Sequence, residues 1–171
     1  MRGIEPVIVA AEVMRSFNAA KGGEDMDYRK FGEIWYIRMD RGDEVIRGIL
    51  DVCEREGIRS AVFSGIGGLS RAEVQTFRPE RGEFETEAVE GMLELVCLNG
   101  NVIVDADGAR RQHTHALLAY KDGAEHRVAG GHVKSLTVLY TAEIELRPVV
   151  GGEIRWRFNP ETGTGFWDFG K

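Results

Sequence analysis

The sequence is poor in the features that would point at once to a specialised class of protein. Only two cysteines occur in 171 residues, Cys53 and Cys97. They form no C-x-x-C pair, which argues against a disulfide framework and against a cysteine zinc site. No apolar run approaches the length of about 18 residues that a membrane span needs, and no secretory leader with a cleavage site is visible. We therefore expect a cytoplasmic protein with no membrane partner.

An excess of positive charge is also missing. The formal net charge is -6, and charged residues make up 29% of the chain. An acidic chain does not attract phosphate backbones over its whole surface, so direct DNA binding would require a local basic patch. We expect most arginines to be solvated surface charges rather than parts of such a patch. The candidates are Arg38, Arg41, Arg110, Arg111, Arg147, Arg155 and Arg157.

Length and composition indicate one main domain, because 171 residues with 43% hydrophobic residues can bury a substantial core. Residues 1–25 are interpreted as an N-terminal appendage, and residues 26–148 as the main domain. Residues 149–171 form a C-terminal extension that we expect to pack on the domain or on a neighbouring subunit. The reason is its aromatic content, which would be costly to leave in water: Phe166, Trp167 and Phe169.

Hydrophobic periodicity predicts one clear helix and many strands. Apolar residues at helical spacing, from Val45 to Cys53, predict a helix that begins near Gly42 and ends before Gly57. Alternating patterns predict strands at residues 33–39, 60–64, 72–77, 84–87, 92–99, 102–105, 112–120, 133–146 and 153–158. Turn signals such as Asn99-Gly100 separate them. Sequential strands joined by short turns favour an antiparallel sheet.

A glycine cluster follows the strand predicted at residues 60–64. The run G-I-G-G at residues 65–68 resembles a phosphate-binding loop only superficially, because Ser70 replaces the third glycine and no G-K-[ST] follows. We interpret the cluster as a tight turn between two strands.

Three of the four histidines fall within twenty residues, in H-T-H at 113–115 and in G-G-H at 130–132. On a strand, residues i and i+2 share a face, about 7 Å apart. Glycines allow backbone conformations that could bring His132 to the same point. Three neutral nitrogen donors without a thiolate are typical of a zinc site with an open fourth position. The alternative is a set of half-exposed polar residues, and both interpretations stay open at this point. His126 is interpreted as a surface residue.

Four sequence blocks together resemble the plant and prokaryote conserved (PPC) domain family over residues 28–148. The first is I-W-Y-I-R-M-D-R-G-D-E-V-I at 34–46, the second V-F-S-G-I-G-G-L at 62–69, and the third L-E-L-V-C-L-N-G-N-V at 93–102. The fourth joins H-T-H at 113–115 to G-G-H-V at 130–133 and T-A-E-I at 141–144. The order of the blocks is what makes the resemblance specific.

The resemblance implies an α/β (α+β) fold with a mainly antiparallel sheet, one principal helix and short extra helices, assembled as a homotrimer. Because prokaryotic members carry the same histidines, it also implies that His113, His115 and His132 bind a metal. Plant members use a six-residue segment to engage transcription factors. The corresponding residues here are Gly91, Met92, Leu93, Glu94, Leu95 and Val96, with Met92 in place of the arginine expected there. Plant members also carry AT-hooks, and no R-G-R-P occurs in this chain.

Three functions follow from these observations. The first is a zinc-binding trimeric module with a regulatory role, associated with DNA or with a regulatory protein partner. The second is a metal-dependent hydrolase or hydratase, in which Glu94 or Glu143 would act as the base or contact a ligand. The third is a sensor that takes a small ligand at the open metal position. We favour binding over catalysis, because no H-E-x-x-H or comparable signature is present. The metal expected is Zn²⁺, although other divalent transition metals suit the same donors.

Overall fold

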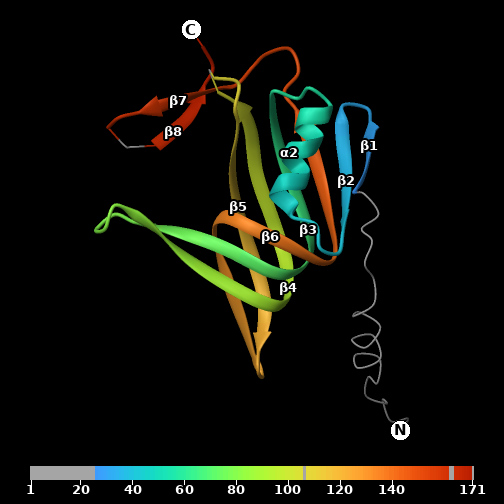
Figure 1. Ribbon diagram of the computed structural model, residues 1–171, viewed down its shortest axis with the longest axis vertical. Coiled ribbons are helices and arrows are strands. Elements are labelled where there is room, and N and C mark those ends of the chain that lie inside the picture. The colour runs from blue at the N-terminus through green and yellow to red at the C-terminus, as the bar shows by residue number, and fades with distance from the viewer. Residues whose placement is uncertain (1–25, 106, 162–163, 171) are drawn as a thin grey trace.

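The computed structural model describes residues 26–105, 107–161 and 164–170 (Figure 1). The predicted N-terminal appendage, residues 1–25, lies outside the described residues. The remainder forms nine elements: β1 (Asp27–Phe31), β2 (Ile34–Asp40), α2 (Val45–Arg55), β3 (Ser60–Arg78), β4 (Glu83–Val104), β5 (Arg110–Asp122), β6 (Glu125–Pro148), β7 (Arg155–Asn159) and β8 (Thr164–Asp168). Every strand pairing is antiparallel. The prediction of a mainly antiparallel α+β fold in one domain is confirmed.

The single described helix, α2, packs on the sheet through its apolar stripe. Glu44 caps its N-terminus by accepting a hydrogen bond from the Arg47 backbone N–H at 2.7 Å, and its other oxygen accepts one from the Leu136 N–H of β6 at 2.9 Å. Gly57, with a φ of 64°, follows the end of the helix. The helix agrees with the prediction. The short extra helices do not occur among the described residues.

Two of the predicted turns lie inside long strands. Residues 65–68 belong to β3, which runs for 19 residues with register shifts at the glycines. A Cβ on Gly67 would lie 2.6 Å from the Thr141 carbonyl oxygen, so glycine is needed there for close contact between β3 and β6. Asn99-Gly100 likewise lies within β4, where Gly100 packs against the ring of Phe63. The turn interpretation of both glycine sites was wrong, because the glycines serve close packing between strands.

The sheet closes on itself through β6. The strand order is β1-β2-β6-β3-β4-β5, with an additional pairing between β6 and β5. The first part of β6 pairs with β5 up to His132, and the rest, from His132 onward, pairs with β3 and then also with β2. His132 is therefore the residue at which β6 passes from one neighbour to the other. Figure 1 shows this bend: β6 runs up from the β5–β6 turn and then crosses to the side of the sheet where α2 and β2 lie.

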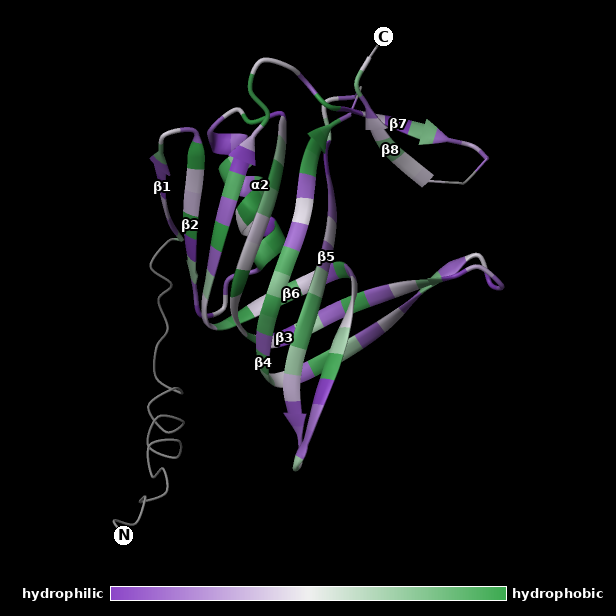
Figure 2. Ribbon diagram, turned by 180° about the vertical axis from the view of Figure 1, so that it is seen from behind, coloured by the Kyte–Doolittle hydropathy of each residue, from purple (hydrophilic) through white to green (hydrophobic). Residues whose placement is uncertain are grey.

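The core lies where the closed strands meet α2. Beyond their contact with β6, strands β3 and β4 extend as a two-stranded arm, residues 76–85, which we call the β3–β4 arm. Figure 2 shows apolar stretches concentrated in the middle of the strands, while the far end of this arm is polar. The largest side chains that are fully buried come from α2 and from most strands of the sheet, and include Met39, Ile49, Leu69, Leu98, Leu118 and Leu136. No helix of the described chain has the length and apolar character that crossing a membrane requires.

The C-terminal extension forms a two-stranded hairpin, β7–β8, separate from the main sheet. The connection to it is held by an ion pair between Arg59 and Glu153, 2.9 Å apart. The guanidinium of Arg111 on β5 lies 4.5 Å from the ring centre of Trp156 on β7. These contacts place the hairpin at the end of the domain where β4 ends and β5 begins (Figure 1).

Candidate metal centre

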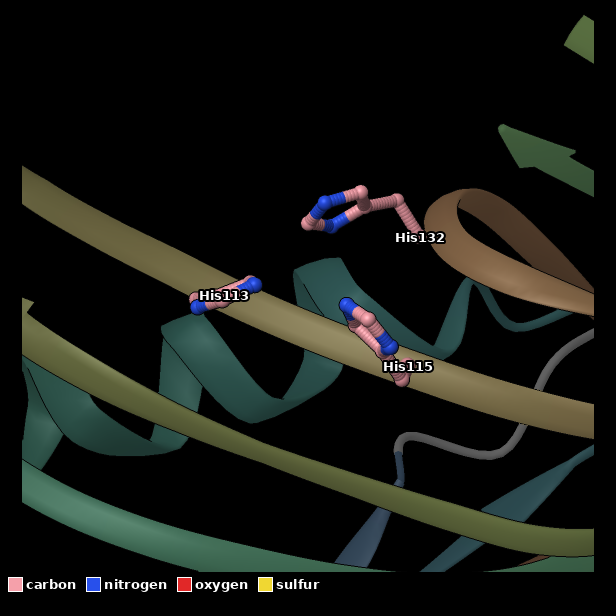
Figure 3. A group of neighbouring side chains, drawn as sticks. All are labelled: His113, His115 and His132. Carbon is pink, nitrogen blue, oxygen red and sulfur yellow. The ribbon is translucent and has the colours of Figure 1, made fainter. Parts of the chain in front are cut away.

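Strand register brings the three predicted histidines together. His113 and His115 lie two residues apart on β5, so their side chains leave the same face of the strand. His132 on β6 is the direct partner of His115 across the pairing of β5 with β6. Figure 3 shows the three imidazoles pointing into one common space from these two strands.

The distances suit a shared cation. Each imidazole offers a nitrogen, and the three nitrogens lie within 4.8 Å of one another. In a tetrahedral zinc site with bonds of about 2.0 Å, ligand nitrogens lie about 3.3 Å apart, so small ring rotations would complete the geometry. No fourth histidine, cysteine or carboxylate joins the group within the described part of the chain. The donor set that these residues offer to a metal is therefore three imidazole nitrogens.

The surroundings favour the neutral form that a metal requires. Burial lowers the pKa of His113, and the nearby His115 lowers it further. Burial also lowers the pKa of His132, with further lowering by His115 and His113. Phe84 of β4 packs edge-on against His132 at 5.1 Å between ring centres. At neutral pH His113 and His132 are therefore unprotonated donors.

A cavity of about 390 Å³ opens above His113 and His132. The base of the β3–β4 arm forms one side of it and the β7–β8 hairpin forms another. The lining is aromatic and amide-rich, and includes Gln75, Phe84, Asn101, Gln112, Trp156 and Trp167. Sequence reasoning missed these residues. The only signal for any of them was the aromatic character of the C-terminal extension.

The two predicted glutamates lie elsewhere. Glu94 and Glu143 line a different cavity, formed by β3, β4 and β6 beside Met92 and Tyr140. Glu94 is seven residues from Asn101, the β4 partner of His113, which corresponds to roughly 20 Å along the strand. The structure does not bring either carboxylate to the histidines.

The segment predicted for partner binding is part of β4 and presents only alternate side chains. Leu93 and Leu95 are buried in the core, whereas Met92, Glu94 and Val96 face outward.

Neither cysteine belongs to the histidine cluster. Burial raises the pKa of the Cys53 thiol to about 11, so it is no nucleophile at neutral pH.

Comparisons with known proteins agree with the fold. A metal-containing protein from Archaeoglobus fulgidus is 30% identical, with a TM-score of 0.70 over 85% of this chain and 99% of the relative. A plant- and prokaryote-conserved (PPC) protein from Pyrococcus horikoshii is 29% identical, with a TM-score of 0.71 over 88% and 99%. A Ralstonia eutropha protein described as a "putative DNA-binding protein" is 25% identical, with a TM-score of 0.73 over 82% and 94%.

No curated protein gave a significant match. The family model that matches describes the Plants and Prokaryotes Conserved (PCC) domain, and it covers residues 26–150. This range contains the whole closed sheet, α2 and all three histidines. The match therefore extends over most of the chain, in agreement with the resemblance found in the four sequence blocks. The chain belongs to the Plants and Prokaryotes Conserved domain family, whose members are also called PPC proteins.

Proposed function

We propose that this protein is a zinc-binding regulatory protein that takes a ligand at an open metal position. The observation that supports this most directly is the convergence of His113, His115 and His132, with nitrogens within 4.8 Å. Sites with three protein ligands leave a position for water or a ligand, whereas structural zinc sites have four. Neutral imidazoles also suit zinc better than they suit calcium or magnesium, which prefer oxygen ligands. The relative from Archaeoglobus fulgidus, which is described as metal-containing, supports metal binding in a protein of this fold.

The lining of the histidine cavity favours binding over hydrolysis. A metal-bound water needs a base within hydrogen-bond reach to act as a nucleophile through general base catalysis. Among the residues that the structure describes, no aspartate or glutamate lines the cavity over the histidines. Glu94 and Glu143, the carboxylates considered from the sequence, lie at another cavity. A role in recognition fits this arrangement better than a hydrolase or hydratase.

The charge distribution favours a partner other than DNA. Over the described residues, many arginines are paired with carboxylates, as Arg71 is with Glu90 and Arg147 with Glu145. An arginine whose charge is already balanced by a carboxylate neutralises a phosphate less well, and so displaces fewer of the counterions condensed on DNA. DNA binding is part of the description of the Ralstonia eutropha relative only. For this chain we propose a small ligand or a regulatory protein as the partner.

The test of the metal centre is the metal content of protein purified without a histidine tag. We expect about one zinc per chain after dialysis against metal-free buffer, because three imidazoles hold the ion in place. Elemental analysis by plasma mass spectrometry measures the content directly. Less than a tenth of an equivalent, both as purified and after zinc addition, would contradict the proposal.

We also propose that the protein is a homotrimer, as the family resemblance implies. Exposed apolar side chains on β3, β4 and β6 support an interface, since large exposed apolar patches mark contact sites. They are Ile66, Met92, Val96 and Tyr140, each 41–55% exposed. Sedimentation equilibrium should give three times the chain mass of 19.1 kDa. A Val96→Glu variant should dissociate, whereas a Val128→Glu variant, changed at an exposed valine away from this patch, should not.

A further inference from the structure

The β7–β8 hairpin lies beyond the part of the chain that the family model matches, residues 26–150. Trp156 and Trp167, directly opposite each other in the hairpin, both line the cavity above His113 and His132. The cavity of about 390 Å³ is within the size range of small-molecule sites, about 300–1,000 Å³. This chain's own C-terminal extension therefore forms one wall of a half-open cavity beside His113 and His132.

The wall that the hairpin contributes is fixed in place by a chain of contacts. Asp105 is buried and accepts hydrogen bonds from the backbone N–H groups of Asp107 and Ala109 and from Arg111, the last at 2.7 Å. Burial opposes ionisation of Asp105, but these bonds outweigh it and lower its pKa. The guanidinium held in this way lies 4.5 Å from the ring centre of Trp156.

Gly165 completes this arrangement on the other side of the indole. A Cβ at this position would lie only 1.9 Å from the Trp156 ring nitrogen, so glycine is required for the indole to lie across β8. Trp156 is thus confined between Arg111 and the backbone of β8. The pocket is preformed, which reduces the entropic cost of binding a ligand.

The lining specifies the charge of the ligand. The only charged side chain among the described lining residues is Arg111, and no aspartate or glutamate is present, although the chain carries a net charge of -6. Three neutral imidazoles leave the charge of a divalent cation uncompensated. An anionic donor is therefore favoured at the open position of the metal, and the amide groups of Gln75 and Asn101, the strand partners of His132 and His113, line the same cavity.

The lining also indicates which chemical group the ligand carries besides its anionic donor. Phe84 lies against His132 at one side, while Trp156, Phe166 and Trp167 form the opposite wall. Aromatic side chains favour planar rings, which they contact by offset stacking or edge to face. We propose that the cavity binds a small aromatic carboxylate, with its carboxylate on the metal and its ring between Phe84 and Trp167. This inference rests on the proposed metal centre.

The test uses the full chain loaded with Co²⁺, whose visible spectrum reports on the ligands of the metal, and benzoate and acetate as probes. Both carboxylates should change the spectrum, and benzoate should bind at least about tenfold more tightly, because only its ring contacts the aromatic walls. Trp167→Ala and Phe84→Ala should each reduce benzoate affinity to the level of acetate without changing the cobalt content. Phe31→Ala, 66% exposed on β1 and outside the cavity lining, is the matched control and should bind benzoate as the wild type does.

Three results would overturn the inference, and they are distinguishable. Equal affinity for benzoate and acetate in the cobalt-loaded wild type would contradict the aromatic pocket and leave the metal centre standing. Unchanged benzoate binding in both Trp167→Ala and Phe84→Ala, with circular dichroism showing native folding, would place the ring elsewhere. A cobalt content well below one per chain would contradict the metal centre itself, and the inference with it.

Discussion

Replacing His115 with alanine should lower zinc affinity by more than about 100-fold, because removing a residue that merely orients a ligand already costs 10–100-fold. His115 is the direct strand partner of His132, and their ring centres are 4.3 Å apart. Its loss leaves only two imidazoles for the ion. The side chain is exposed, so the change should leave the folded structure intact. Competition with a chromophoric chelator measures the affinity.

The same variant should lose the stabilisation that zinc provides. Zinc at 100 times its Kd stabilises the folded chain by about 2.7 kcal/mol. For a chain of this size, that raises Tm by about 5–10 °C. Thermal unfolding with zinc and with a chelator should therefore differ for the wild type and coincide for His115→Ala.

His126→Ala provides a matched control for this experiment. His126 is also a histidine of the β5–β6 hairpin, is exposed, and pairs with Lys121 six residues away from the cluster. It should retain wild-type zinc affinity and the full thermal shift. If both variants bound zinc as tightly as the wild type does, the ion would have to be held by other groups, and the proposed centre would be wrong.

Local sequence patterns were sufficient to predict the elements whose side chains repeat at regular spacing. The apolar stripe from Val45 to Cys53 predicted α2, and alternation predicted most of β5 and β6. The H-T-H motif predicted that His113 and His115 share a face, because that property depends only on strand geometry. These features require no knowledge of which strands are neighbours.

The rest depends on contacts between distant segments. Gly67 looked like a turn residue, and its role became visible only once the Thr141 carbonyl of β6 was placed 2.6 Å from its absent Cβ. Gln75 and Asn101 reach the histidine cavity because β3 and β4 flank His132 and His113 in register. No spacing along the chain encodes that pairing. The glutamates were considered for the site from sequence blocks alone, and strand register places them at a different cavity.

The position of His132 depends both on a local sequence motif and on contacts between distant strands. The G-G-H motif indicated an unusual backbone before this histidine, but the reason lies in the closure of the sheet. β6 leaves β5 and joins β3 at this residue, so it must pass close to both strands. Gly130 contacts the Ala116 carbonyl on β5, and Gly131 contacts the Gln75 carbonyl on β3. The two glycines are the points at which the crossing strand touches its neighbours.

Replacing Gly131 with alanine should therefore damage both the fold and the site. Its φ of 152° is one that residues with a Cβ rarely adopt, and an added Cβ would lie 2.6 Å from the Gln75 carbonyl oxygen. Backbone strain costs about 1–3 kcal/mol and overpacking a similar amount, which suggests a loss of about 3 kcal/mol. Tm should fall by about 6–12 °C in a thermal melt with a chelator present. Because the clash lies one residue before His132, zinc affinity should fall as well.

The Gly123→Ala variant separates the effect of backbone strain from the effect of overpacking. Gly123 also has a positive φ, 59°, in the turn of the same β5–β6 hairpin, but nothing lies within 4 Å of an added Cβ. It should lose only about 1 kcal/mol, from backbone strain alone, and keep its zinc affinity. If Gly131→Ala were no less stable than Gly123→Ala and bound zinc equally well, close contact with β3 would not be what positions His132. If only Gly131→Ala loses zinc affinity, and it also loses more stability than Gly123→Ala does, then the geometry of the metal centre depends on the closure of the sheet.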